Sequence, residues 1–221
     1  MLDGPGHVRP IEPATLDVVF GRVAAYYAAK LARHGATPQG VDWSCAATQW
    51  LRFVQLLKIC DFDTPFSLID VGCGYGALAA FIRARHPGAR VDYLGIDLSA
   101  AMVRCAKRRH RGRPATRFQA GRNCPHQADY AVASGIMNVT LGCPRPLWED
   151  GVCATLVDLR RVGRSGFAVN FLTAAPEGSA PEMLYCADPA RWVGFCRAEL
   201  GCDVEVLDSY GMREFTLLAR Y

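Results

Sequence analysis

A short glycine-rich segment after a buried strand constrains the fold of this chain more than any other feature. The apolar run Phe66-Ser67-Leu68-Ile69 is followed directly by Asp70-Val71-Gly72-Cys73-Gly74-Tyr75-Gly76, and a helix-like segment, Ala77 to Arg85, comes next. Glycine has no Cβ, so closely spaced glycines at the end of a strand let bare backbone approach a ligand. The segment therefore predicts an α/β protein that binds a nucleoside cofactor.

The rest of the chain alternates between strand-like and helix-like segments. We predict strands over 66–71, 91–96, 116–119, 128–133 and 166–172, and helices over 77–86, 99–110, 147–162 and 188–200. Parallel strands need crossover connections, which are usually helices, so this alternation predicts a doubly wound, mostly parallel sheet. Two final strands, 203–208 and 214–220, are separated by a short connection and predict an antiparallel C-terminal hairpin. The predicted fold class is α/β, with a Rossmann-like seven-stranded sheet.

Two amphipathic helices are expected before the first strand. Apolar residues recur at three- and four-residue steps from Thr15, the expected N-cap, to a stop near Gly35, and a second helix is expected from Ala46 to Ile59. Residues 1–13 are rich in proline and glycine and predict a loose tail. We therefore expect an N-terminal tail and helical cap, residues 1–64, followed by a cofactor-binding domain, residues 65–221.

Composition argues against several other classes of protein. The net charge of +4 is far from the strong bias of a dedicated nucleic-acid binder. The ten cysteines and five histidines lack the spacing of metal ligands, so we expect no metal. No apolar window approaches the roughly 18 residues of a membrane helix, which leads us to expect a soluble cytoplasmic protein without membrane contact. Nothing in the sequence indicates an oligomeric state.

A second carboxylate follows the second predicted strand. The segment reads Gly95-Ile96-Asp97-Leu98-Ser99-Ala100-Ala101-Met102. A carboxylate at this strand end would accept hydrogen bonds from both hydroxyls of a ribose, as in other nucleotide-binding sheets. Leu98 and Met102 would then flank an adenine. The glycine segment and Asp97 together predict a binding site for an adenosine-containing cofactor.

These motifs resemble those of the class I S-adenosylmethionine-dependent methyltransferases, over residues 66 to 220. The resemblance rests on the strand and loop LIDVGCGYG, the segment GIDLSAAM, the strand end at 129–135 and the closing hairpin. More loosely, the chain is similar to small-molecule methyltransferases of the trans-aconitate-methyltransferase-like kind, which carry extra N-terminal helices. The resemblance implies an enzyme that transfers a methyl group from S-adenosylmethionine to an oxygen or nitrogen atom of a small molecule.

The resemblance also implies roles for individual residues. The residues expected against the methionine moiety are Asp70, Gly72, Cys73, Gly74 and Gly76, with Asp97 on the ribose and the Ser134 backbone near the cofactor amino group. Many relatives place an acid after the third strand to bind the adenine amino group. This chain reads Phe118-Gln119-Ala120-Gly121-Arg122-Asn123 there, so Gln119 or Asn123 would have to take that role.

The acceptor side of the site is less constrained by sequence. Methyl transfer can rest on holding the nucleophile and the methyl group in place, and a base is needed only if the nucleophile arrives protonated. Candidate catalytic residues are Tyr26, His34 and Asn138. Cap residues expected to contact the cofactor are Trp43 and the cations Lys30 and Arg52, either of which can pair with the cofactor carboxylate. The alternative for each is a place on the surface or in the packing of the cap.

Two alternative functions stay open at this point. Gly72, Gly74 and Ala77 also satisfy the GxGxxG/A pattern of an NAD-dependent oxidoreductase, although a third glycine at 76 does not favour a pyrophosphate site. The run 104–113 is densely basic and would suit an RNA methyltransferase, or simply a solvated helix end. The small-molecule methyltransferase is the interpretation we prefer.

Overall fold

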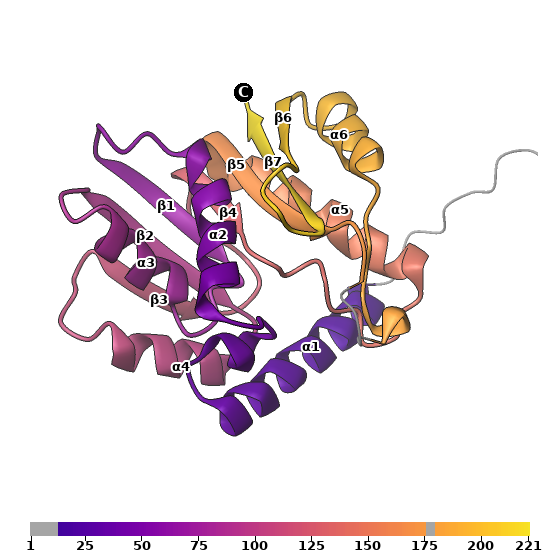
Figure 1. Ribbon diagram of the computed structural model, residues 1–221, viewed down its shortest axis with the longest axis horizontal. Helices are drawn as coiled ribbons and strands as arrows, with labels where there is room; N and C mark the ends of the chain where they lie inside the picture. Colours follow the sequence, from indigo (N-terminus) through magenta and orange to yellow (C-terminus); the bar gives the residue numbers. More distant parts are fainter. Residues whose placement is uncertain (1–12, 176–179) are drawn as a thin grey trace, which may run out of the picture.

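The computed structural model describes residues 13–175 and 180–221, and a seven-stranded sheet lies at its centre (Figure 1). The strands are β1 (Phe66–Val71), β2 (Val91–Asp97), β3 (Thr116–Ala120), β4 (Ala128–Ala133), β5 (Gly163–Leu172), β6 (Asp203–Leu207) and β7 (Glu214–Arg220). They lie in the order β3-β2-β1-β4-β5-β7-β6. The first five pair in parallel, and β7 is antiparallel to both β5 and β6. The predicted α/β fold with an antiparallel C-terminal hairpin is confirmed.

Six α-helices surround this sheet within the described part of the chain. They are α1 (Pro13–His34), α2 (Ala46–Leu56), α3 (Ala77–Arg85), α4 (Ala100–Arg109), α5 (Arg145–Val162) and α6 (Pro189–Ala198). Three short 3-10 turns complete the connections: η1 (Pro38–Val41), η2 (Leu57–Ile59) and η3 (Pro181–Met183). None of the helices in residues 13–175 and 180–221 combines the length and apolar character needed to cross a membrane.

The helices bury two hydrophobic cores, one on each face of the sheet. Successive side chains of a strand point to opposite faces, so Leu68 and Ile69 of β1 enter different cores. One core joins α2, α3 and α4 to the face that carries Leu68. The other joins α5 and α6 to the opposite face, where Leu156 and the fully buried Trp192 pack. Both faces are therefore covered, as a mostly parallel sheet requires.

Helix α1 lies across the end of the sheet, running from beside α4 toward α5 (Figure 1). Its buried residue Val19 joins the core that includes α5. The outward face of the same helix is polar or exposed, as at Asp17 and Val18. Helix α1 is therefore positioned to cover whatever binds at the strand ends.

Helix ends agree with the local sequence signals at most positions. Ser99 and Asp188 accept hydrogen bonds from the N–H groups of Met102 and Ala190, which makes both of them N-caps. Helix α1 ends at the predicted Gly35, whose φ of 67° is left-handed. The Thr15 cap is wrong, because the helix already begins at Pro13. Residues 1–12 of the predicted N-terminal tail, and residues 176–179, lie outside the described residues.

Candidate active site

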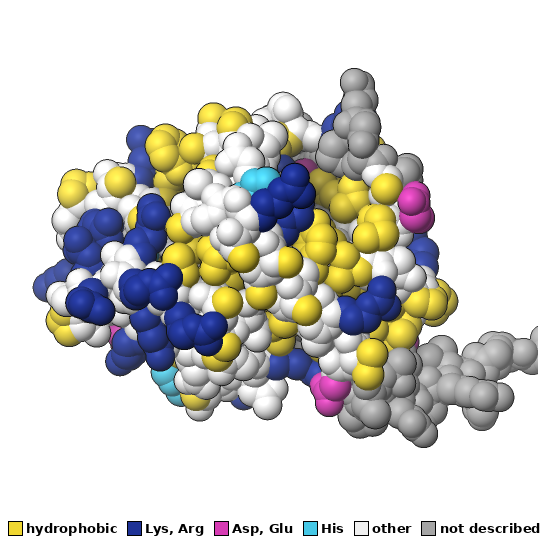
Figure 2. Space-filling model, turned by 90° about the horizontal axis from the view of Figure 1, so that it is seen from below, with side chains coloured by type: hydrophobic (Ala, Val, Ile, Leu, Met, Phe, Trp, Pro, Cys, Tyr) yellow, Lys and Arg dark blue, Asp and Glu magenta, His cyan; other side chains and the backbone are white. Residues whose placement is uncertain are grey.

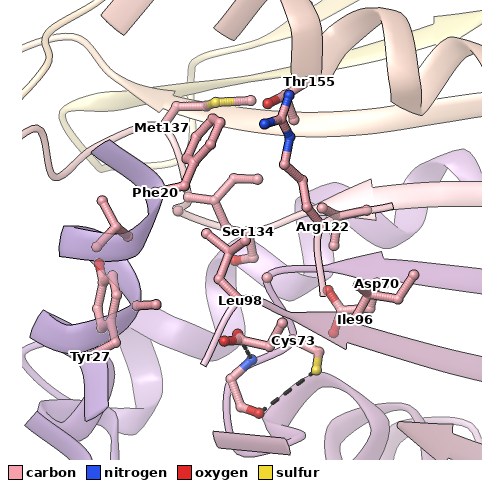
Figure 3. Close-up of a pocket in the computed structure, with 18 of the residues that line it drawn as sticks. Phe20, Tyr27, Asp70, Cys73, Ile96, Leu98, Arg122, Ser134, Met137 and Thr155 are labelled. Carbon is pink, nitrogen blue, oxygen red and sulfur yellow. Dashed lines mark hydrogen bonds between the residues drawn. The ribbon is translucent and has the colours of Figure 1, made fainter. Parts of the chain in front are cut away.

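A cavity of about 270 Å³ lies at the carboxyl ends of β1, β2 and β4, beneath α1 (Figure 3). Its walls come from the glycine loop, which we define as residues 72–76, from the segments after β2 and β4, and from α1 and α5. Strand β1 lies between β2 and β4, so the cavity is at the point where the order of the strands reverses. Open α/β sheets bind their ligands at this position.

The glycine loop has a backbone path that side chains would obstruct. Gly72 and Gly76 have φ angles of 76° and 79°, which L-amino acids with a side chain rarely adopt. A Cβ on Gly72 would overlap Cγ2 of Ile136, because the loop passes directly against the segment after β4. The carbonyl of Gly76 lies 2.9 Å from Nε2 of the buried His110. His110 thus supports the loop from behind, a role that its place in a basic run did not indicate.

Asp97 lies at the end of β2 and faces the glycine loop. Its Oδ2 accepts the N–H of Gly74 and its Oδ1 accepts the N–H of Ser99, both at 2.8 Å. Burial raises the pKa of this carboxyl, and the two N–H bonds oppose that rise. Each carboxylate oxygen retains a free lone pair for a ligand hydroxyl. Leu98 and the buried Met102 line the cavity on the same side.

Asp70 is the most buried carboxyl of the cavity wall, with 2% of its surface exposed. It accepts a hydrogen bond from the hydroxyl of Tyr93. Burial, with a smaller contribution from nearby Asp97, raises the pKa of Asp70 to about 7. A cationic group on a ligand would favour the ionised carboxylate.

The segment after β4 forms the opposite wall. Ser134 lines the cavity, and its Oγ is buried without a hydrogen-bond partner within the described residues. The N–H of Gly135 donates to Oδ1 of Asn170 at 2.8 Å. The indole of Trp43 lies so close to Gly135 that a Cβ there would overlap it. Trp43 is therefore a wall residue of the cavity, where the sequence had placed it.

Lys30 and Arg52 have partners inside the chain. Lys30 Nζ lies 2.6 Å from Oδ1 of Asp42. Arg52 pairs with Glu214, and its guanidinium stacks 3.7 Å from the ring centroid of Trp43. Neither cation is among the residues that line the cavity. The sequence predicted Lys30 and Arg52 as cofactor contacts, but the structure does not bring either of them to the cavity.

The three predicted catalytic residues also lie outside the cavity wall. His34 is the half-buried last residue of α1, and Asn138 is buried beyond the strand end. Tyr26 packs edge-on against Tyr27 at 5.1 Å, and only Tyr27 lines the cavity. Adjacent residues of a helix point about 100° apart, which is why one tyrosine faces in and the other does not.

Sequence reasoning placed the N-terminal cap over the site but missed most of the residues through which α1 and α5 contribute to this wall. The α1 residues that line it are Leu16, Val19, Phe20, Val23, Ala24 and Tyr27, and those of α5 are Leu147, Trp148, Gly151, Val152, Ala154, Thr155, Asp158 and Leu159. The apolar stripe of α1 and its place in a cap were recognised, but a stripe alone does not say which of its side chains face the cavity. Arg122 and Asn123 also line the cavity, whereas Gln119 does not. Asn123 is thus the better placed of the two predicted adenine contacts.

The basic run occupies a separate surface. The exposed cations are Arg104, Lys107, Arg108, Arg109, Arg111 and Arg113. They gather over α4 and the turn after it, in the dark-blue group at the left of Figure 2. None of them lines the cavity. Among the described side chains, no group of three or more His, Cys, Asp or Glu residues is arranged to hold a metal ion.

Fold and site together define a nucleoside-cofactor enzyme of the Rossmann-like class. Residues 69–151 match the family model described as a methyltransferase domain. The chain is 41% identical to "Putative methyltransferase Rv1506c" of Mycobacterium tuberculosis over 165 residues, which cover 74% of this chain and 98% of that protein. The chain therefore belongs to the S-adenosylmethionine-dependent methyltransferases, and it is an enzyme of the class I fold.

Solved structures agree at the level of the fold. A SAM-dependent methyltransferase from Aquifex aeolicus has a TM-score of 0.53 and 18% identity, covering 76% of this chain and 88% of that one. Human N-acetylserotonin methyltransferase in complex with SAM has a TM-score of 0.61 and 17% identity, covering 95% and 60%. The family assigns the cofactor as S-adenosylmethionine, so the NAD-dependent alternative is not retained.

Proposed function

We propose that this enzyme methylates an oxygen or nitrogen atom of a small molecule held in the cavity beneath α1. The observation that carries the proposal is the partial cover that α1 gives the cavity, since this helix crosses the strand ends and supplies one of its walls. A concave pocket of this kind fits a small molecule. The extra helices before β1 support the likeness to trans-aconitate-methyltransferase-like enzymes, with an N-terminal tail and helical cap in residues 1–64 and a cofactor-binding domain in residues 65–221.

The residues present fit the cofactor. Asp97 has free lone pairs for the ribose hydroxyls, and the glycine loop offers backbone at close range to the methionine moiety. Ser134 Oγ is a buried polar atom that needs a partner, and Asp70 would be stabilised in its ionised form by an amino group. Leu98 and Met102 offer an apolar surface for the adenine.

The chain's contribution to the reaction is positioning rather than proton transfer. When bound, S-adenosylmethionine supplies a methyl group whose carbon bonds to the acceptor lone pair, while the electrons of the broken bond stay on sulfur. The described wall residues include no histidine and no lysine. Burial raises the pKa of Tyr27, so this phenol stays protonated and is a poor base. We therefore assign catalysis to proximity and orientation, with any acceptor proton released to solvent.

Calorimetry with S-adenosylhomocysteine tests the cofactor site. Asp97→Ala is expected to weaken binding at least about tenfold, because the variant loses the ribose contact and the hold on Gly74. Asp92→Ala is the matched control, since Asp92 belongs to the same strand but pairs with Arg117 on the surface. Equal affinity in wild type and Asp97→Ala would remove Asp97 from the proposed site.

RNA is the alternative acceptor, and the exposed cations over α4 are the observation that favours it (Figure 2). Formation of S-adenosylhomocysteine is to be measured with a small-molecule filtrate of a cell extract and, separately, with total RNA. We expect turnover with the filtrate alone. Turnover that depends on RNA, and that falls steeply with added salt, would instead establish the alternative.

A further inference from the structure

One end of the cavity is a compartment between α1 and α5, which we call the apolar chamber. Its wall consists of Leu16, Val19, Phe20, Met137, Trp148 and Val152. The two helices meet closely here: a Cβ on Gly151 would lie 3.5 Å from Phe20 and 3.6 Å from Leu16. Figure 3 shows Phe20 and Met137 facing the same space, away from Asp70 and Cys73. The chamber thus lies beside the proposed cofactor site and is distinct from it.

Polar atoms around the chamber already have partners. Trp148 Nε1 donates to the carbonyl of Met137 at 3.0 Å, and Thr155 Oγ1 donates to the carbonyl of Gly151 at 2.8 Å. Asp158 pairs with Arg161 at 2.6 Å. The donor groups of Trp148 and Thr155 are thus already used, so an anionic group of a ligand would lose its water here without gaining a replacement donor, which costs free energy.

Cations that would attract an anionic acceptor are held elsewhere. Lys30 and Arg52 are outside the wall and paired with carboxylates. Arg122 does line the cavity, but its Nη1 lies 3.1 Å from Asp17, and its guanidinium packs 4.7 Å from the ring centroid of Phe20. Its side chain is 44% exposed, so it lies at the solvent edge of the cavity rather than within it. An anionic acceptor therefore finds no uncompensated charge in the chamber.

We propose that the apolar chamber selects an uncharged acceptor with an apolar body. The inference rests on the proposed function and narrows it, because it excludes a carboxylate acceptor from the chamber. The wall offers a large apolar area on two helices and no free cation among the described residues. Hydrophobic burial then supplies the binding free energy, in proportion to the apolar area removed from water.

Binding of two matched probes to the enzyme saturated with S-adenosylhomocysteine tests this inference. The neutral fluorophore N-phenyl-1-naphthylamine reports occupancy, and 1-naphthalenemethanol and 1-naphthoate compete for it. We expect the neutral alcohol to displace the fluorophore at a concentration at least about tenfold lower than the carboxylate. Equal or stronger displacement by the carboxylate would overturn the inference.

A chamber-filling variant locates the binding. Gly151→Leu places a side chain between α1 and α5 and is expected to weaken fluorophore binding at least about tenfold, with little change for S-adenosylhomocysteine. Gly194→Leu is the matched control, because Gly194 lies within helix α6 with no atom near its Cβ position. Fluorophore binding that Gly151→Leu leaves intact would show that the probe binds elsewhere and would contradict the inference.

A second variant covers the case in which Gly151→Leu does not fold. Phe20→Ala enlarges the chamber, so the enzyme should gain affinity for a longer neutral ligand, N-phenyl-1-naphthylamine bearing a hexyl chain, relative to the parent fluorophore. An unchanged ratio would count against the assigned location. If wild type fails to bind S-adenosylhomocysteine at all, the proposed function fails, and fluorophore binding without cofactor still reports on the chamber.

Discussion

Arg52 of α2 and Glu214 of β7 form a buried ion pair whose side chains are only 7% and 1% exposed. Nε of Arg52 lies 2.8 Å from both carboxylate oxygens. Glu214 also accepts a hydrogen bond from Asn170 at 3.2 Å, and Asn170 in turn accepts the N–H of Gly135. The pair thus connects the helix before the first strand to the strand end that borders the cavity.

Removing one member of this pair should destabilise the protein strongly. Glu214→Ala leaves the Arg52 guanidinium buried without a counter-charge, and breaking a buried pair in this way costs about 3–5 kcal/mol of unfolding free energy. Urea denaturation followed by circular dichroism measures the loss. Glu205→Ala is the control, because its pair with Arg220 is exposed and such pairs contribute about 0–1 kcal/mol. Similar losses in the two variants would show that burial does not strengthen the first pair.

Substitution by alanine should destabilise the protein more at Gly72 than at Gly112, which has a similar φ angle but open space around its Cβ position. Gly72→Ala combines left-handed backbone strain with overlap of Ile136, which together cost about 2–4 kcal/mol. Gly112 has a φ of 79° with no atom near its Cβ position, so Gly112→Ala carries the backbone cost alone. Thermal unfolding and S-adenosylhomocysteine affinity are to be compared. Equal effects at both sites would mean that Ile136 moves aside freely.

The fold could be predicted because its signals are local. Strand-helix alternation and the short connection between the last two strands predict a parallel sheet with a hairpin, and Asp70 and Asp97 lie at the carboxyl ends of strands that meet at one edge. The predicted stop of the first helix near Gly35 also depends only on neighbouring residues. Each of these predictions required no knowledge of distant packing.

Much of the acceptor side could not be predicted, because it depends on which distant groups meet. The partner of Arg52 lies far along the chain at Glu214, and no spacing rule connects them. Helix α1 faces the cavity with Tyr27 rather than Tyr26, which depends on how the helix is rotated against the sheet. The contribution of α5 likewise follows from the angle at which α1 crosses the strand ends. Such relationships arise from tertiary packing and leave no local pattern.

Stability should depend on pH through Asp70. Burial raises its folded-state pKa to about 7, above the unfolded value near 3.9. The buried carboxyl holds its proton more tightly than the same group in the unfolded chain. Its contribution to the free energy of unfolding is therefore complete below the unfolded pKa and is lost as pH rises through about 7. Asp70→Asn removes this titration, so the variant should gain stability relative to wild type as pH rises across that range. Urea denaturation at a series of pH values measures the difference, and a constant difference would contradict the assignment.

Lys30 should contribute little to cofactor binding, because its ammonium is already paired with Asp42 and lies outside the cavity wall. Lys30→Met keeps the length of the side chain and removes the charge, and we expect the dissociation constant of S-adenosylhomocysteine to change by less than about threefold. Lys58→Met is the control, since Lys58 is exposed on η2. A tenfold or larger loss in Lys30→Met alone, corresponding to about 1.4 kcal/mol, would mean that α1 moves on binding and that Lys30 leaves Asp42 for the cofactor carboxylate. Calorimetry on the two variants therefore decides whether the cap is preformed around the cofactor or rearranges to enclose it.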